Sequence, residues 1–301
     1  MTRKEWIHQA RHQLLQAGIE TPRLDAEVLT AFVLGTDRIQ LYMYPEKEIM
    51  RPEAERLQQL VERRASGEPV AYLTGHQEFM GLDFRVTPDV LIPRPDTEIL
   101  VETVIETFSA MRRKNPSQKL LAADIGTGSG CIAVSLAKMV SDLTVLAVDN
   151  SPAALRTATQ NIRLNGVEGR VLPIEGHLLE PVQATLKKMG LQPASLHAVV
   201  SNPPYLSDSE MEAVTGTSAA SEPKSALTGG PEGLDFYREI TSKAQPLLRA
   251  GGLLAYEIGY SQRKVVMDLM TLYGFEQVNC LKDLAGHDRV VTGKKALADT
   301  R

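Results

Sequence analysis

The sequence predicts an α/β protein with a seven-stranded, mostly parallel sheet, preceded by a small helical domain. From residue 119 onward, short apolar runs alternate with amphipathic runs at the spacing of β-α units. A glycine-rich turn follows the first of these apolar runs, and residues 1–75 have helical periodicity. At 301 residues, the chain is long enough for about two domains.

The composition argues against two classes of protein. The formal net charge is −4, whereas a protein that wraps nucleic acid by bulk electrostatics is expected to be basic. The first residues are polar, unlike a signal peptide, and no apolar run approaches the roughly 18 residues needed to span a bilayer. We therefore expect a cytoplasmic protein whose two cysteines, Cys131 and Cys280, are reduced core thiols.

Residues 1–75 are expected to form a compact helical domain. Apolar residues at helical spacing predict three helices, which end near Gly18, Gly35 and Gly67. His8 and His12 lie one helical turn apart, a spacing found in zinc sites. No third ligand is evident, so we expect two surface histidines and no metal.

Residues 76–95 are expected to form a β-hairpin that links the two domains, because apolar residues are mixed there with glycine and proline. Pro93-Arg94-Pro95-Asp96 predicts a stiff corner, after which a helix is expected to begin at Asp96 or Thr97. The α/β domain is then expected to occupy residues 96–301.

Seven strands with intervening helices are expected in this α/β domain. The last two strands are joined only by residues 282–287, which is too short for a parallel crossover, so the sheet should end in an antiparallel pair. Residues 214–233 are rich in glycine, serine and alanine and predict a long functional loop. The expected strands are 119–125, 143–148, 170–174, 196–201, 251–258, 275–281 and 288–293. The clearest helices are 130–140, 152–164, 235–249 and 261–272.

A glycine-rich loop follows the first strand of the α/β domain. Glycines let a backbone turn sharply and approach a ligand closely. The G-x-G-x-G spacing, with Cys131 where a dinucleotide fingerprint needs its last glycine, weakens a nicotinamide interpretation. An acidic residue at the start of the loop suits a ligand with an amino group better than a pyrophosphate, although a purely structural turn is the alternative. The candidate cofactor-binding residues are Asp124, Gly126, Thr127, Gly128, Ser129 and Gly130.

The second strand ends in Asp149, and Ser151-Pro152 then begins the next helix. An acid at this position can bond both hydroxyl groups of a ribose, although a lone acid at a strand end is often only a cap. The glycine loop upstream favours ribose binding. Ribose together with a positively charged amino-acid tail describes S-adenosylmethionine, so this methyl donor is the expected cofactor.

The fourth strand runs into Asn202-Pro203-Pro204-Tyr205, where two prolines end the ladder. Planar nitrogens are poor nucleophiles because the lone pair is delocalised. The Asn202 side-chain oxygen and the Pro203 carbonyl can accept both N–H groups of such a nitrogen, and Tyr205 offers a face for the planar group. Methyl transfer then depends on positioning and electrostatics. These four residues are the candidate catalytic residues.

These motifs resemble class I S-adenosylmethionine-dependent methyltransferases that act on planar nitrogen. With the helical N-terminal domain, the chain resembles over nearly its whole length the HemK/PrmC family of peptide-chain-release-factor glutamine methyltransferases. Further segments carry this resemblance: residues 90–98, the run from Glu222 to Gly230, Glu257-Ile258-Gly259 with Gln262, and residues 283–289.

The resemblance implies a Rossmann-like methyltransferase domain behind a helical domain that helps to dock the substrate. It implies methylation of the glutamine side-chain amide in the Gly-Gly-Gln motif of class 1 release factors, with no membrane and no stable nucleic-acid partner. The glycine loop would line the methionine part of the cofactor, Asp149 the ribose, and Asn202 to Tyr205 the glutamine amide. Three further family positions lie near the pocket without an assignable role: Arg94, Glu98 and Glu222.

Two positions depart from the family pattern; the smaller departure is Glu232, where the family typically has an aspartate before Gly233. After the third strand, the family usually has an acidic residue that can meet the adenine, whereas this chain has His177 there. Leu178, the next residue, can still pack on the adenine ring.

Three alternative functions are weighed against this interpretation. An adenine-N6 nucleic-acid methyltransferase shares the Asn-Pro-Pro-Tyr chemistry but needs a basic surface to extract a base from its stack. A non-catalytic adaptor with this fold would show loss of Asn202 or of the glycine loop, and both are intact. A nicotinamide oxidoreductase needs a different glycine spacing.

Overall fold

The computed structural model describes residues 1–214 and 221–297, which form two compact units. One unit contains Met1–His76, and the other contains Gln77–Ala213 and the described residues from Glu222 onward. The predicted loop at 214–233 falls partly outside the described residues. None of the helices within the described ranges is long and apolar enough to cross a membrane.

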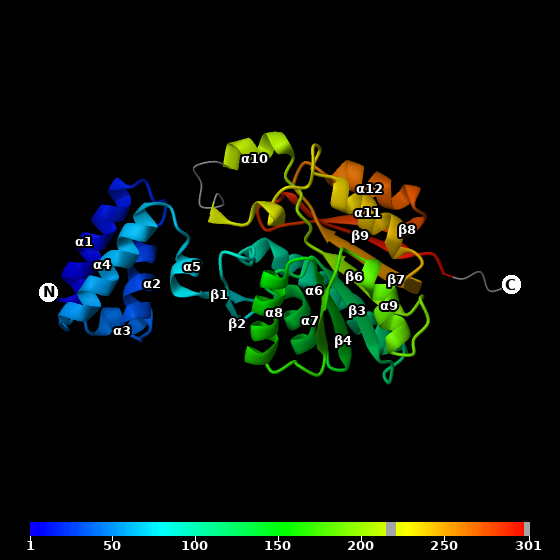
Figure 1. Cartoon of the computed structure of the whole chain (residues 1–301), viewed down its shortest axis with the longest axis horizontal. Coiled ribbons are helices and arrows are strands. Elements are labelled where there is room, and N and C mark those ends of the chain that lie inside the picture. Colours follow the sequence, from blue (N-terminus) through cyan, green and yellow to red (C-terminus); the bar gives the residue numbers. More distant parts are fainter. Residues whose placement is uncertain (215–220, 298–301) are drawn as a thin grey trace. The chain divides into compact units, whose positions relative to one another are not determined.

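The first unit is built from α-helices, as its periodicity predicts (Figure 1). Trp6, Leu14, Leu29 and Leu57 are almost completely buried in its core. Two of its helices are only one or two turns long, too short for the apolar periodicity by which longer helices are recognised. The helices are α1 (Arg3–Gln16), α2 (Pro22–Val33), α3 (Arg38–Met43), α4 (Arg51–Ala65) and α5 (Val70–Thr74).

A two-stranded hairpin, β1 (His76–Phe79) and β2 (Leu82–Arg85), precedes the large sheet. It is shorter than the hairpin expected at 76–95, because residues 86–94 form no strand. Helix α6 (Pro95–Lys114) then begins at Pro95, one residue earlier than expected. A proline suits the first helical turn because its missing N–H would have no partner there.

The second unit contains a seven-stranded sheet with the order β5-β4-β3-β6-β7-β9-β8. The neighbours from β5 to β7 are parallel, and β9 runs antiparallel to both β7 and β8. The seven strands and the antiparallel end predicted from the sequence are confirmed. The strands are β3 (Leu120–Ile125), β4 (Leu143–Asp149), β5 (Val171–Glu175), β6 (Leu196–Ser201), β7 (Leu248–Glu257), β8 (Phe275–Lys282) and β9 (Asp288–Lys295).

Helices cover both faces of this sheet (Figure 1). Successive strand residues point to opposite faces, so in β3 Leu120 and Ala122 join one core cluster while Leu121 and Ala123 join the other. The first face is covered by α6, α7 (Cys131–Met139) and α8 (Pro152–Leu164). The second face is covered by α9 (Glu180–Lys188), α11 (Asp235–Ala244) and α12 (Arg263–Leu272). Two short elements complete this unit: α10 (Asp208–Val214) and the 3-10 helix η2 (Lys224–Ala226).

The strand order reverses between β3 and β6. The chain proceeds from β3 outward through β4 to β5, and then returns so that β6 pairs with the other side of β3. Ile125 and Ser201 are partners in this pairing and end the two strands together. In open α/β sheets, a crevice for ligands forms outside the carboxyl ends of the strands at such a switch point.

Candidate functional site

A cavity of about 290 Å³ opens at this switch point, and all of its lining residues belong to the second unit. It lies against the loops that follow β3, β4, β5 and β6, together with the segment before α6 and residues 223–228. Nine of the residues predicted from the sequence line this cavity: Gly126, Thr127, Gly128, Ser129, Asp149, Leu178, Asn202, Pro203 and Pro204.

The glycine loop between β3 and α7 is tied to the end of the neighbouring strand. The backbone N–H groups of Gly126 and Thr127 both donate to the Val148 carbonyl, at 2.9 Å each. Gly126 and Gly128 have φ values of 71° and 54°, which side chains other than glycine rarely adopt. The loop therefore presents bare backbone to the cavity at a fixed height above the sheet.

Asp124 and Gly130 support the loop from behind and do not line the cavity. The Asp124 side chain is fully buried; its Oδ2 accepts hydrogen bonds from the Thr127 hydroxyl at 2.6 Å and from the Ala133 N–H at 3.2 Å. Its Oδ1 is buried without a hydrogen-bond partner among the described residues. Burial raises the pKa of this carboxyl to about 7.

Asp149 joins the glycine loop to the loop after β4. Its Oδ2 accepts from the Gly128 N–H and its Oδ1 from the Ser151 N–H, both at 2.9 Å. An ionised carboxylate has about four lone-pair sites, so both oxygens can still accept hydrogen bonds from a ligand. Asp149 is thus both a structural cap and a candidate ligand-binding group at the cavity wall.

Asn202 extends from the end of β6 into the cavity wall. Its Nδ2 donates to the Thr97 hydroxyl at 3.2 Å, which fixes the side-chain amide at one end. Pro203 and Pro204 follow it along the wall. The Asn202 Oδ1 and the Pro203 carbonyl have no hydrogen-bond donor among the described residues.

Tyr205 lies behind the cavity wall, with its backbone held from two sides. The Gln262 Nε2 donates to the Tyr205 carbonyl at 2.9 Å and to the Gly233 carbonyl at 3.1 Å. The next residue, Leu206, exchanges backbone hydrogen bonds with Leu227 and Gly229 at 3.0 and 2.8 Å. The segment after 220 therefore braces the Asn-Pro-Pro-Tyr turn.

The histidine that departs from the family pattern lies in the loop after β5. His177 lines the cavity, and its Nε2 is 3.0 Å from Glu239 Oε1. Leu178 also lines the cavity and adopts a φ of 48°. The structure thus provides an apolar side chain and an imidazole in this part of the cavity.

Arg94 and Glu222, which had no role assignable from spacing, form an ion pair. The Glu222 carboxylate is buried and also accepts the Ile92 N–H at 3.2 Å, so it joins the corner before α6 to the segment after 220. Glu98 does not line the cavity; it accepts the Met80 N–H at 2.6 Å in the hairpin. Within residues 1–214 and 221–297, no group of three or more His, Cys, Asp or Glu side chains is arranged to hold a metal ion.

Thr97 and Glu257, which the sequence places only within longer family segments, meet at the site, and Thr97 also lines the cavity. The Thr97 hydroxyl donates to Glu257 Oε2 at 2.5 Å, and each of these residues is 2% exposed. Burial raises the pKa of Glu257 to about 7. Thr97 lies in the first turn of α6 and Glu257 ends β7, 160 residues apart, so no local sequence pattern predicts their contact.

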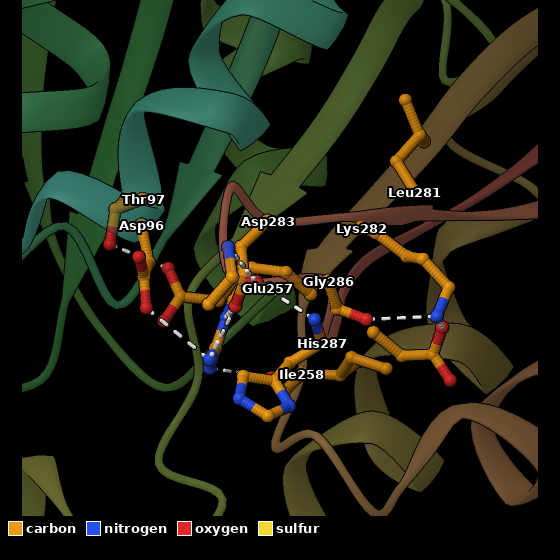
Figure 2. A network of polar contacts seen from close by, with 12 residues as sticks. Asp96, Thr97, Glu257, Ile258, Leu281, Lys282, Asp283, Gly286 and His287 are labelled. Carbon is orange, nitrogen blue, oxygen red and sulfur yellow. Dashed lines mark hydrogen bonds and ion pairs between the residues drawn. The ribbon is translucent and has the colours of Figure 1, made fainter.

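A network of ion pairs surrounds this contact. Figure 2 shows Asp96 and Thr97 beside Glu257 and Asp283. Arg289 donates to Asp283 at 3.0 Å and to the Ile258 carbonyl at 3.4 Å, and its guanidinium forms an ion pair with Asp96 at 3.3 Å. The turn between β8 and β9 is thereby joined to the start of α6, which gives Asp283 and Arg289 a structural role.

The fold and the site together define a class I methyltransferase. A model of the methyltransferase small domain matches residues 97–234, and a model of the PrmC N-terminal domain matches residues 5–75. A methyltransferase from Pyrococcus furiosus has the same fold, with a TM-score of 0.50 and 17% identity over 81% of this chain and 100% of that chain.

Two curated relatives identify the family. A release factor glutamine methyltransferase of Moorella thermoacetica is 44% identical and covers 96% of this chain and 97% of its own length. That of Geobacter sulfurreducens is 42% identical and covers 94% of this chain and 93% of its own length. The chain belongs to the release factor glutamine methyltransferase family.

Proposed function

We propose that this protein methylates the side-chain amide nitrogen of the glutamine in the Gly-Gly-Gln motif of class 1 peptide chain release factors, with S-adenosylmethionine as methyl donor. The observation that carries the proposal is the juxtaposition of Asn202 and the glycine loop at the ends of adjacent strands, around one cavity. A donor site and an acceptor site for a planar nitrogen are then contiguous.

The residues of the chain fit this donor. The glycine loop presents backbone to the methionine part, and Asp149 retains lone pairs for the ribose hydroxyl groups. The buried Asp124 carboxyl lies behind the loop, and its ionised form would favour an ammonium group nearby. Leu178 provides apolar surface for the adenine. When bound, the donor supplies an electrophilic methyl group.

The acceptor amide is held by hydrogen bonds that its own N–H groups donate. The Asn202 Oδ1 and the Pro203 carbonyl accept these two N–H groups, which returns electron density to the nitrogen and orients its lone pair. Proline rigidity fixes the direction of the carbonyl. The nitrogen loses one proton to water as it is methylated, so no strong general base is needed before the transfer.

We propose that a helical domain at residues 1–75 helps to dock the release factor. The hairpin linker is proposed at 76–95 and the catalytic domain at 96–301. The PrmC N-terminal domain model that matches residues 5–75 supports this division. Because release factors act in translation, we propose a cytoplasmic location, with no membrane partner and no stable nucleic-acid partner.

Mass spectrometry of a class 1 release factor incubated with the protein and S-adenosylmethionine tests the proposal. The expected result is one added methyl group on the glutamine of Gly-Gly-Gln. A release factor with that glutamine replaced by asparagine serves as the matched control and should stay unmodified. Transfer of labelled methyl to adenine in DNA or RNA, with the release factor untouched, would favour the nucleic-acid alternative instead.

A further inference from the structure

The two ends of the Asn202 side-chain amide have opposite hydrogen-bonding character. Its oxygen is an acceptor and its nitrogen is a double donor, so only one orientation suits a substrate that donates N–H groups. In the structure, Nδ2 donates to the Thr97 hydroxyl at 3.2 Å. The Oδ1 is left as the end that can accept from the substrate.

Thr97 can accept from Asn202 because its own proton is used elsewhere. A hydroxyl carries a single proton, and that of Thr97 is donated to Glu257 Oε2 at 2.5 Å. An ionised carboxylate only accepts hydrogen bonds, so it holds the Thr97 proton on its own side. The Thr97 lone pairs then face Asn202 and select its nitrogen.

We propose that Glu257, acting through Thr97, determines which end of the Asn202 amide faces the substrate, and that both are positioning residues for the methyl transfer. The inference rests on the proposed function. Without this pair, the amide of Asn202 can turn by half a rotation. Its NH₂ group would then oppose the N–H groups of the substrate, and two donors repel each other.

The backbone of two adjacent strands brings Glu257 next to Asn202. Ser201 and Tyr256 are partners across β6 and β7, so Asn202 and Glu257 are the next residues along two adjacent strands. The backbone carbonyl of Glu257 is also fixed, because it accepts from the Tyr237 hydroxyl at 3.0 Å. Thr97 reaches both residues from the first turn of α6.

The charged groups around Glu257 come from several elements. Burial raises the pKa of its carboxyl to about 7 and Asp96 acts in the same direction, whereas Thr97, Arg289 and Asn202 act to lower it. Burial raises the pKa of Tyr205 to about 12, and the nearby Glu257 acts in the same direction, so the phenol stays neutral. Above neutral pH, Glu257 is therefore the acceptor that the proposed orientation requires.

Steady-state methylation of the release factor by three variants of α6 tests the proposal. Thr97→Val keeps the shape but removes the hydroxyl, and should lower kcat about tenfold with KM for the release factor nearly unchanged. Thr97→Ser keeps the hydroxyl and should restore most of kcat. Thr103→Val is the matched control, because its hydroxyl only donates to the Ile99 carbonyl of the same helix, at 2.7 Å.

Binding of S-adenosylmethionine by calorimetry and the circular dichroism melt separate positioning from folding. Thr97 lines the cavity, so the Kd of Thr97→Val for the donor should stay within a few-fold of the wild-type value while kcat falls further. If Thr97→Val does not fold, Glu257→Gln is measured in its place. Glutamine has the same shape as glutamate, but its side-chain amide can donate as well as accept, so it no longer holds the Thr97 proton on its own side. Wild-type kcat in the folded Thr97→Val variant, or equal losses in Thr97→Ser, would overturn the proposal. A wild-type enzyme that leaves the release factor unmodified would instead overturn the proposed function.

Discussion

Replacing Asp149 by asparagine is expected to weaken donor binding strongly. In the native chain, both carboxylate oxygens accept backbone N–H groups, from Gly128 and Ser151 at 2.9 Å. An asparagine has one oxygen and one NH₂, so one of these N–H groups would face a donor and the ribose would lose an acceptor. Hydrogen bonds to charged groups contribute about 1.5–3 kcal/mol each. Loss of one such bond to the ribose corresponds to a rise in Kd of roughly 10- to 150-fold.

Isothermal titration calorimetry with S-adenosylmethionine measures this effect. Glu175→Gln is the matched control, because Glu175 is the register partner of Asp149 at the end of the next strand and does not line the cavity. The control should bind the donor as the wild-type protein does. A Kd for Asp149→Asn within about twofold of the wild-type value, a difference of only about 0.4 kcal/mol, would refute the assignment of this carboxylate to the ribose.

Four further results are expected. Asn202→Ala should abolish detectable transfer to the release factor, while donor affinity measured by calorimetry changes only a few-fold; equal loss of both would contradict the separate roles. Wild-type kcat should fall as pH drops through about 7, because the proton then on Glu257 ends its role as acceptor, and Glu257→Gln should flatten this profile. The raised pKa means that the native state binds this proton more tightly than the unfolded state does. As pH rises from about 4.5 to 7, the free energy of unfolding of the wild-type protein should therefore decrease relative to that of Glu257→Gln. Gly233→Ala should lower kcat and the melting temperature, because at a φ of 70° its Cβ would lie 2.2 Å from the Tyr205 carbonyl oxygen. The control is Gly190→Ala, which has a φ of 73° and no atom within 4 Å, and which should cost only the backbone strain of about 1–2 kcal/mol. Equal melting temperatures in the two variants would contradict the role of the clash.

The sequence was most informative where a strand ends in a chemically distinctive residue. The glycine loop, Asp149 and Asn202 each follow an apolar run, and the parallel sheet brings such ends to one edge. Asp124 was grouped with the loop, yet it lies behind it. Strand alternation accounts for this: Ile125 lines the cavity, and Asp124 therefore points to the opposite face, toward the start of α7.

The remaining parts of the site depend on contacts across long stretches of chain. Thr97 meets Glu257 over 160 residues, and Arg94 meets Glu222 over 128. Neither pair has a characteristic spacing, because helix packing on the sheet determines which residues meet. His177 shows the complementary case: the sequence identified the unusual residue, and the structure adds its partner Glu239 on α11.

The insertion of β9 between β7 and β8 has a consequence for how the molecule is made. Strands β7 and β8 are both synthesised before β9. Each of them pairs with β9, and they do not pair with one another. Until β9 arrives, the edge of β7 has no neighbour, and unpaired edges invite association with other chains. The same strand carries Arg289, whose ion pairs reach the start of α6. A nascent chain interrupted before β9 would therefore be both prone to aggregation and without this brace beneath its active site.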